Sequence, residues 1–245
     1  MVVNLPMAIL AGGLGRRIDP FTRSTPKAII EVAGKPFVFH QIELLQRHGF
    51  GRIVLCVGHL GGLIEETVGD GTRWGLDVRY SYDGPELLGT GGALRRALPL
   101  LGEAFFVTYA DGYLDCDYGG IETAFLESGS QGLMTIFRNK DRWDKSNVLY
   151  QSGRIVSYDK RNPDPACEHI DYGVGVLRAK SISRYEADTP IDLEAIYKDL
   201  VAQDELAAYE VPTRFYEIGS PEGLEATRQY LARKTAEDGL YSKSS

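Results

Sequence analysis

The chain has 245 residues and a formal net charge of −7, with 43% hydrophobic and 25% charged residues. These proportions exclude a disordered or low-complexity chain. A pI near 5.2 argues against a nucleic-acid surface, which needs clustered basic charge. No apolar run approaches the roughly 18 residues of a membrane helix, and the amino terminus lacks the features of a signal peptide. With three scattered cysteines, we expect a cytoplasmic protein.

The first half alternates strand-like and helix-like patterns. In chain order we expect a strand at Met7–Leu10, a helix at Pro36–His48 that ends before Gly49, a strand at Ile53–Val57, a helix at Leu60–Val68, a strand at Val78–Tyr82, a helix at Gly92–Leu101 and a strand at Ala104–Tyr109. Strands separated by helices predict βαβ units and a mostly parallel sheet with both faces covered.

The pattern changes to predominantly strands after about residue 130. We expect strands at Leu133–Arg138, Asn147–Gln151, Arg154–Tyr158 and Ile170–Leu177, then helices at Leu193–Ala202 and Pro221–Lys234. Ser152-Gly153 predicts a hairpin between two of the strands, and Pro221 suits the first position of a helix. We therefore expect a single α/β domain over residues 1–235, followed by a polar tail at 236–245.

A glycine-rich loop follows the first strand, in Leu10-Ala-Gly-Gly-Leu-Gly-Arg-Arg17. Glycines at this place let a ligand approach the backbone, whose N–H groups can surround an anion. The Walker pattern is absent, and Ile18 stands where the dinucleotide pattern G-x-G-x-x-G needs its third glycine, which argues against a dinucleotide-dependent oxidoreductase. Two arginines and Lys27 follow the loop and suit a polyphosphate. The alternative is an ordinary turn with incidental surface cations.

Three segments match, in order and spacing, the opening of the sugar-1-phosphate nucleotidyltransferases: Leu10–Arg17, Thr25-Pro-Lys-Ala28 and Val32-Ala-Gly-Lys-Pro36. Leu88-Gly-Thr-Gly-Gly-Ala-Leu94 resembles the family's second glycine segment, which receives the nucleobase. The chain looks most like short heptose- and mannose-1-phosphate guanylyltransferases and muramate-type uridylyltransferases. The resemblance implies a Rossmann-like three-layer αβα fold with a mixed, mostly parallel sheet. Its nucleotide half would span about 6–130 and its β-rich sugar half about 131–232.

In this family a sugar phosphate attacks the α-phosphorus of a nucleoside triphosphate, and pyrophosphate leaves. The reaction needs two anions held together, with Mg²⁺ (or Mn²⁺) and cations to offset their repulsion. Carried over residue by residue, the resemblance implies that Arg17 holds the β- and γ-phosphates and that Lys27 stabilises the α-phosphate. It assigns the metal to Asp111 and to Glu217, where many relatives have Asp.

The resemblance also implies a set of nucleotide-binding positions. These are Leu10, Ala11, Gly12, Gly13, Gly15, Arg16, Asp83, Gly89 and Thr90. Two positions depart from the family pattern near the phosphates. Arg16 replaces the usual threonine, and Ala110 replaces the glycine before the metal aspartate. Neither change removes a functional group, so we expect an active enzyme rather than an inert regulatory subunit, which stays the alternative.

The resemblance implies that the second half of the chain binds the sugar phosphate. Asp159 and Lys160 resemble the family's acid–lysine pair, in which the lysine contacts the sugar phosphate. Asp171 and Gly173 fall where relatives often carry an Asn-Ala-Gly that touches sugar hydroxyls. Because a carboxylate only accepts hydrogen bonds, Asp171 would require donors from the sugar. The alternative for Asp159 and Lys160 is an ordinary exposed turn.

The nucleobase is addressed by the stretch Asp83-Gly-Pro-Glu86, just before the second glycine segment. Uridylyl- and thymidylyltransferases often place a glutamine there, and this chain has none. Asp83 and Glu86 accept hydrogen bonds only, and guanine offers them two adjacent donors, N1–H and the N2 amino group. We therefore expect GTP first, with CTP or UTP as alternatives. The alternative is that both carboxylates simply face solvent.

The expected partners are a nucleoside triphosphate and a sugar 1-phosphate of the heptose or mannose type, with no nucleic acid and no membrane. A non-sugar phosphate acceptor stays open. We expect a monomer or a homodimer.

Overall fold

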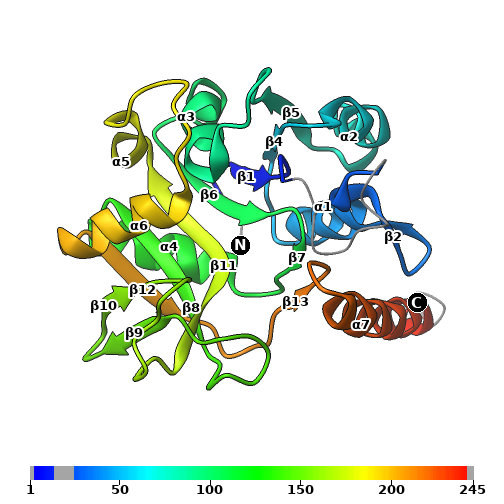
Figure 1. The fold of residues 1–245 in the computed structure, drawn as a ribbon. Coiled ribbons are helices and arrows are strands. Elements are labelled where there is room, and N and C mark those ends of the chain that lie inside the picture. The colour runs from blue at the N-terminus through cyan, green and yellow to red at the C-terminus, as the bar shows by residue number, and fades with distance from the viewer. Residues whose placement is uncertain (1–2, 14–24, 242–245) are drawn as a thin grey trace.

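The computed structural model describes residues 3–13 and 25–241 (Figure 1). The strands are β1 (Met7–Leu10), β2 (Glu31–Val32), β3 (Lys35–Pro36), β4 (Arg52–Val57), β5 (Asp77–Tyr82), β6 (Ala104–Tyr109), β7 (Gly112–Tyr113), β8 (Gly132–Arg138), β9 (Val148–Gln151), β10 (Arg154–Tyr158), β11 (His169–Arg178), β12 (Leu206–Glu210) and β13 (Tyr216–Glu217). The helices are α1 (Phe37–Arg47), α2 (Gly61–Val68), α3 (Gly89–Leu101), α4 (Tyr118–Ser128), α5 (Ala179–Ser183), α6 (Leu193–Ala202) and α7 (Pro221–Tyr241), with short 3₁₀ turns at Lys27–Ile29 and Thr72–Trp74.

Within the described residues, nine strands form one mixed sheet. Its main path runs β10-β9-β11-β6-β1-β4-β5, with β8 beside β11 and β12 beside β8. The strands β6, β1, β4 and β5 pair in parallel. The antiparallel pairing of β11 with β6 joins them to the β-rich second half. The expected α/β class with a mixed sheet is confirmed.

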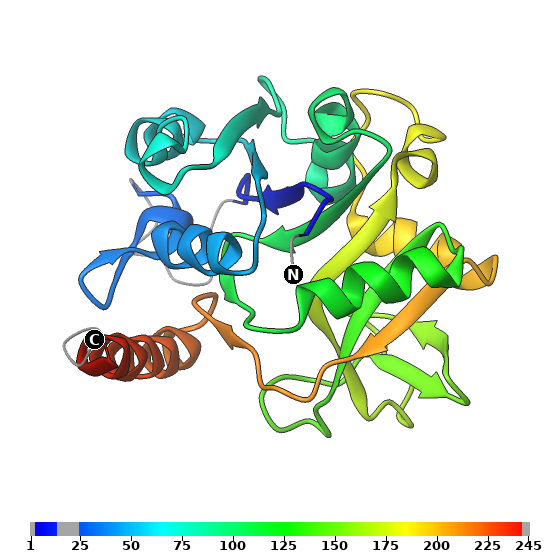
Figure 2. The same ribbon diagram turned by 180° about the vertical axis from the view of Figure 1, so that it is seen from behind.

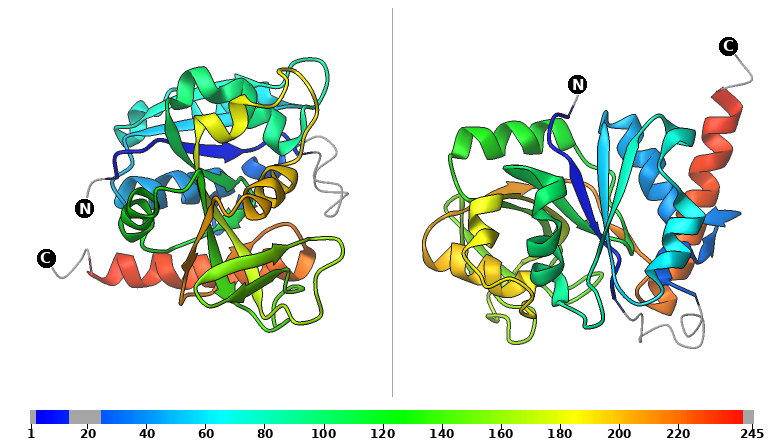
Figure 3. Two further views of the ribbon diagram at one scale, coloured as in Figure 1. Left: turned by 90° about the vertical axis from the view of Figure 1, so that its left-hand side faces the viewer. Right: turned by 90° about the horizontal axis from the view of Figure 1, so that it is seen from above.

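Helices cover both faces of this sheet (Figure 3). The reason lies in the strand alternation, which sends successive side chains to opposite faces. Met7 and Ile9 of β1 pack with α1, α2 and α4, whereas Ala8 and Leu10 pack with α3, α5 and α6. The result is the three-layer arrangement that the resemblance implies.

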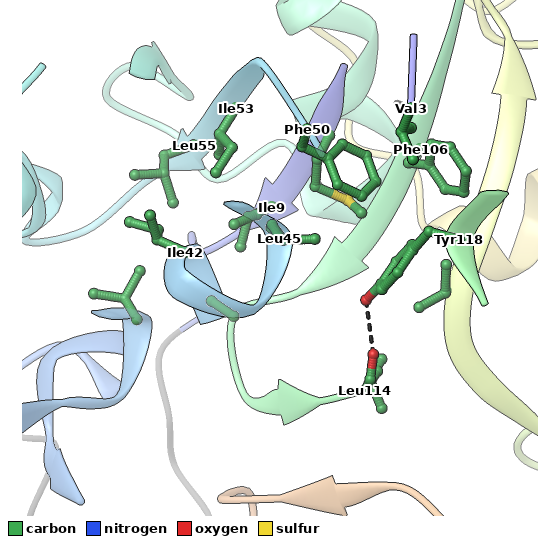
Figure 4. Close-up of a cluster of buried hydrophobic side chains, with 14 of the residues drawn as sticks. Val3, Ile9, Ile42, Leu45, Phe50, Ile53, Leu55, Phe106, Leu114 and Tyr118 are labelled. Carbon is green, nitrogen blue, oxygen red and sulfur yellow. Dashed lines mark hydrogen bonds between the residues drawn. The ribbon is translucent and has the colours of Figure 1, made fainter. Parts of the chain in front are cut away.

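The face covered by α1 and α4 holds a continuous apolar cluster, part of which Figure 4 shows. Ile42 and Leu45 of α1 belong to it together with Phe106 of β6. Tyr118, at the start of α4, is buried among them, and its hydroxyl donates to the carbonyl of Leu114 at 2.8 Å. This cluster fixes the end of β6 that leads into the site described below.

A smaller cluster attaches α7, which packs beside α1 at the molecule's edge (Figure 2). Leu224 and Leu231 of α7 pack there with Phe37 and Leu44 of α1 and with Ile218. The last helix thereby anchors the short strand β13, which immediately precedes it.

Local signals in the sequence explain several element ends. Gly49 follows the C-cap of α1 with a φ of +84°, which glycine adopts without strain. Ser152 and Gly153 have φ values of +51° and +80° and connect β9 to β10, as a tight hairpin requires. Pro221 begins α7 as predicted.

Other boundaries were wrong. The last helix does not end at Lys234, because α7 continues to Tyr241 through a stretch rich in good helix formers. The helix α3 begins at Gly89 rather than Gly92, since a neighbouring segment supplies acceptors for its first N–H groups. The sequence patterns also missed α4 and β12.

No helix in the described ranges is both long enough and apolar enough to cross a membrane.

Candidate active site

A pocket opens at the carboxyl ends of β1 and β6, beside the N-terminus of α3. Open α/β sheets bind ligands at such strand ends. Every predicted nucleotide or catalytic position that the structure describes lines this pocket, namely Leu10, Ala11, Gly12, Gly13, Lys27, Asp83, Gly89, Thr90 and Asp111. Gly15, Arg16 and Arg17 lie outside the described residues. Segments spread over a hundred positions of the chain thus meet at one place.

One end of the pocket carries an ion pair. Lys27 begins the 3₁₀ turn Lys27–Ile29, and Asp111 follows β6. Lys27 Nζ donates to Asp111 Oδ2 at 2.9 Å, with the two side chains 15% and 30% exposed. An ammonium group and a carboxylate so placed can respectively neutralise a phosphate and bind a cation.

Glu217 joins this pair through the pairing of β13 with β7. That pairing sets Glu217 opposite Gly112, and the N–H of Ile218 donates to the Asp111 carbonyl at 2.8 Å. The Glu217 carboxylate accepts from the N–H of Gly219 and, at 2.5 Å, from the hydroxyl of Ser220. The protein therefore holds both carboxylates in fixed positions.

Three charged side chains approach the backbone at Gly219 so closely that a side chain there would collide with one of them. A Cβ atom there would lie 2.7 Å from Glu217 Oε2, 3.3 Å from Asp111 Oδ2 and 3.5 Å from Lys27 Nζ. Within the ranges 3–13 and 25–241, His, Cys, Asp and Glu side chains form no group of three or more around a possible metal site. Two carboxylates nevertheless fit Mg²⁺, which commonly takes one or two protein carboxylates and completes its shell with water and phosphate oxygens.

Asp83 lies toward another part of the pocket and is only 5% exposed. Its Oδ2 would lie 3.2 Å from a Cβ at Gly12 and 3.3 Å from a Cβ at Gly58, so bare backbone surrounds it. Burial raises the pKa of Asp83, and the Leu88 N–H and the Arg96 charge only partly oppose this effect. Glu86, the other carboxylate of the stretch, is exposed and does not line the pocket.

The second glycine segment receives a strap of this chain, the segment 189–193. The Ile191 carbonyl accepts from the N–H groups of Gly91 and Gly92 at 2.8 and 3.1 Å, which caps α3. The Thr90 hydroxyl accepts from the Leu193 N–H at 2.7 Å. A Cβ at Gly89 would lie 2.7 Å from the Ile191 carbonyl oxygen. Close approach of the strap therefore explains these glycines, although Gly89 and Thr90 also line the pocket.

The strap carries a carboxylate that the sequence patterns missed. Asp192 is exposed and lines the pocket beside Gly89. In the sequence it reads only as a residue before a helix, and nothing marks its contact with a segment a hundred positions away. Tyr109, which also lines the pocket, was missed because it is the last residue of β6 and reads as part of a buried strand.

Lys160 and Asp171 form a second charged group next to the pocket. Lys160 Nζ lies 3.2 Å from Asp171 Oδ2 and 5.1 Å from the centre of the Tyr109 ring. Burial lowers the pKa of Lys160, but the Asp171 carboxylate and Tyr109 raise it by more, so the net shift is upward and the amine stays protonated. Lys160 and Asp171 do not themselves line the pocket, and Tyr109 connects them to it.

The Asp171 carboxylate is nearly saturated by the protein. Besides Lys160, it accepts from the Tyr158 hydroxyl at 2.9 Å and from the Gly173 N–H at 3.0 Å. Gly173 has a φ of +99° inside an irregular stretch of β11, a conformation that favours glycine. Asp171 thus has little capacity left for the sugar hydroxyls that the sequence analysis assigned to it.

Asp159 points away from this group. Its Oδ1 accepts from the N–H groups of Arg161 and Asn162 at 2.8 Å each, and its Oδ2 lies 2.7 Å from Lys198 Nζ. Asp159 therefore closes the turn that carries Lys160.

Comparison with known proteins identifies the family. The family model described as nucleotidyl transferase matches residues 7–147, more than half of the chain. The chain belongs to the nucleotidyl transferase family. The matched region contains β1, the Lys27 turn, Asp83 and Asp111, and the resemblance seen in the sequence is therefore confirmed.

Two curated relatives match different shares of the chain. The mannose-1-phosphate guanylyltransferase catalytic subunit beta of Drosophila melanogaster is 27% identical over 218 residues, covering 87% of this chain and 59% of its own length. The N-acetylmuramate alpha-1-phosphate uridylyltransferase of Neisseria meningitidis is 40% identical over 111 residues, covering 45% of this chain and 48% of its own. The chain thus spans less than two thirds of either relative.

A solved structure supports the fold. HddC from Yersinia pseudotuberculosis, in a structure described as complexed with GMP-PN, superposes with a TM-score of 0.76 at 24% identity, over 93% of this chain and all of that one.

Proposed function

We propose that this chain transfers a nucleoside monophosphate from a nucleoside triphosphate, preferentially GTP, to a heptose- or mannose-type sugar 1-phosphate, releasing pyrophosphate. The observation that carries this proposal is the approach of Lys27, Asp111 and Glu217 to Gly219, with Lys27 and Asp111 themselves lining a pocket that also contains Gly12, Gly13 and Gly89. Positioning and charge neutralisation are what nucleotidyl transfer requires of a protein.

In this proposal Lys27 exchanges its Asp111 partner for the α-phosphate and stabilises the negative charge that develops there. Arg17 holds the β- and γ-phosphates. Asp111 and Glu217 hold Mg²⁺, which when bound supplies positive charge to the phosphate oxygens. Lys160, kept protonated beside Asp171, binds the phosphate of the sugar and brings its oxygen toward the α-phosphorus.

The base preference rests on Asp83. A buried carboxylate accepts from the N1–H and N2 amino group of guanine, whereas uracil would present carbonyl oxygens to it. The Drosophila relative is named a guanylyltransferase, in keeping with this preference.

A specific observation favours a second candidate. The Neisseria uridylyltransferase is 40% identical over 111 residues, which supports UTP as the donor and a sugar phosphate of the muramate type as the acceptor. A CTP-using enzyme, or one with a non-sugar acceptor, is less well supported.

A competition assay decides among these donors. The protein is incubated with Mg²⁺, equimolar GTP, UTP, CTP, ATP and dTTP, and one sugar 1-phosphate at a time, and the products are identified by mass spectrometry. We expect a GDP-sugar as the main product. Use of UTP about tenfold better than GTP would contradict the assignment of Asp83.

A further inference from the structure

The first turns of α6 contact both the nucleotide pocket and the turn that carries Lys160. On the pocket side, the Leu193 N–H donates to the Thr90 hydroxyl at 2.7 Å. On the other side, the Glu194 carboxylate accepts from the Lys160 N–H at 3.1 Å, and Lys198 Nζ lies 2.7 Å from Asp159 Oδ2. One helix end thus holds parts of the two substrate-binding regions together.

We propose that Glu194 and Lys198 are positioning residues that fix Lys160 for the sugar phosphate. This inference rests on the proposed function, in which Lys160 binds the acceptor.

The turn that carries Lys160 is closed locally but needs outside contacts to fix its place. Asp159 closes it by accepting from Arg161 and Asn162. Such a turn determines its own shape and not its orientation against the rest of the molecule. The outside hydrogen bonds come from the Asp159 N–H to the Asn147 carbonyl at 3.1 Å and from the two side chains on α6.

Glu194 and Lys198 form an ion pair in which Glu194 is largely buried and Lys198 is 39% exposed; we call the two residues the bracket. They lie one helical turn apart, with Lys198 Nζ 2.9 Å from Glu194 Oε1, and the Glu194 side chain is only 17% exposed. Burial raises the pKa of Glu194, but hydrogen bonds from Lys198 and from the Lys160 N–H lower it by more, and the net shift is downward. The carboxylate is thus ionised at neutral pH and accepts from both neighbours.

The bracket acts on the reactive end of Lys160 through its backbone. Glu194 holds the main-chain nitrogen, and Asp171 holds the amine at 3.2 Å. With the first contact removed, the main chain at Lys160 can shift and draw the amine away from its present position beside Asp171. A displacement of about 1 Å in a positioning element can cost about a hundredfold in rate.

The nucleotide side should be unaffected by changes to these two side chains. The bond to Thr90 uses the backbone N–H of Leu193, and the cap on α3 uses the Ile191 carbonyl. The inference therefore predicts an effect on the acceptor alone.

The test compares Glu194→Ala with Glu225→Ala. Glu225 lies on α7 in an exposed pair with Arg228 at 2.8 Å, which makes it a matched loss of a helical ion pair. The acceptor is whichever of mannose, glucose, N-acetylglucosamine and glycero-manno-heptose 1-phosphates the wild type uses fastest, with its preferred triphosphate. We expect Glu194→Ala to raise the acceptor KM about tenfold and to leave the KM of the triphosphate unchanged, with Glu225→Ala like wild type.

Two further variants separate positioning from general destabilisation. Glu194→Gln keeps an oxygen acceptor and should restore part of the acceptor KM. In a Lys160→Ala background, Glu194→Ala should cost nothing more, because a residue that acts through Lys160 has no effect without it. Lys198→Gln should also raise the acceptor KM. This variant replaces Glu194→Ala in the test if circular dichroism shows that Glu194→Ala is unfolded.

An unchanged acceptor KM in a folded Glu194 or Lys198 variant overturns the inference, as does a full additional loss in the Lys160→Ala background. If the wild type turns over none of the four acceptors, nor N-acetylmuramate 1-phosphate, with any triphosphate, the proposed function fails and this inference fails with it. The two failures are therefore distinguishable.

Discussion

Lys27 Nζ and Asp111 Oδ2 lie 2.9 Å apart, although 84 positions separate the two residues in the chain. The pair joins the 3₁₀ turn Lys27–Ile29 to the end of β6 at the wall of the pocket. In the proposed reaction this ammonium group meets the α-phosphate and the carboxylate meets the metal, so the pair keeps both groups in place until the substrates arrive.

The loss of Lys27 should therefore affect the chemical step. Lys27→Ala removes a charge contact to the transition state and should lower kcat/KM by at least about a hundredfold. Arg17→Ala should have an effect of the same size. The matched control is Lys35→Ala, which breaks a half-buried pair with Glu43 away from the pocket. Steady-state kinetics that find Lys27→Ala within about threefold of wild type would remove Lys27 from the mechanism.

Activity should require a divalent cation held by Asp111. Asp111→Asn keeps the shape of the side chain and removes its charge, so we expect most activity to be lost while the thermal unfolding midpoint stays close to that of wild type. Mg²⁺ or Mn²⁺ should restore activity to chelator-treated wild type and not to the variant. Undiminished turnover in excess chelator is the outcome that contradicts the metal assignment.

Gly219→Ala tests the convergence of the three charged side chains directly. The added methyl group would lie 2.7 Å from Glu217 Oε2 and 3.3 Å from Asp111 Oδ2, so at least one carboxylate must move. We expect kcat to fall about tenfold or more in a protein that folds normally. Gly62→Ala on α2 is the control, because its Cβ would meet nothing within 4 Å. Equal activities for the two variants would mean that this space is not used.

Because Asp83 is buried, we expect the free energy of unfolding to depend on pH. Its pKa is raised by burial above the ordinary 3.8, so the folded state binds this proton more tightly than the unfolded state does. The free energy of unfolding therefore falls as pH rises from the ordinary pKa of Asp83 through its raised pKa in the folded state. At higher pH the ionised, buried carboxylate keeps the folded state less stable. Asp83→Asn removes the charge and should be more stable than wild type at about pH 7.5, with the advantage lost near pH 4.

The measurement is the difference in thermal midpoint between Asp83→Asn and wild type at the two pH values. A difference that does not depend on pH would show that the carboxylate carries no burial cost. The same variant should use GTP less selectively over UTP, because an amide both donates and accepts.

The sequence predicted the parts of the site that depend on local motifs. The glycine loop, Lys27 and Asp111 each follow a strand or precede a helix. These positions were enough to predict that the three lie together at the carboxyl ends of the strands. Asp83, named among the nucleotide-binding positions from the sequence, lines the pocket, whereas Glu86 from the same short stretch is exposed and does not.

Contacts between distant segments were beyond the sequence patterns. The strap 189–193 accepts hydrogen bonds from N–H groups in the first turn of α3, and this helix starts at Gly89 rather than at the predicted Gly92. The same strap places Asp192 at the pocket. The sequence patterns predicted neither the pairing of Asp159 with Lys198 nor the contact of the Lys160 N–H with Glu194 on α6. Tertiary pairing of this kind leaves no local signal.

The measurement that tests the central claim most directly follows the phosphorus atoms of the donor. The protein is incubated with Mg²⁺, a sugar 1-phosphate and its preferred triphosphate, labelled with ³²P at the α-position in one reaction and at the γ-position in another. Nucleotidyl transfer predicts that the α-label enters the nucleotide sugar and that the γ-label appears in pyrophosphate. Label from the γ-position in the sugar product, or no transfer of the α-label with any of the five triphosphates, would contradict the account.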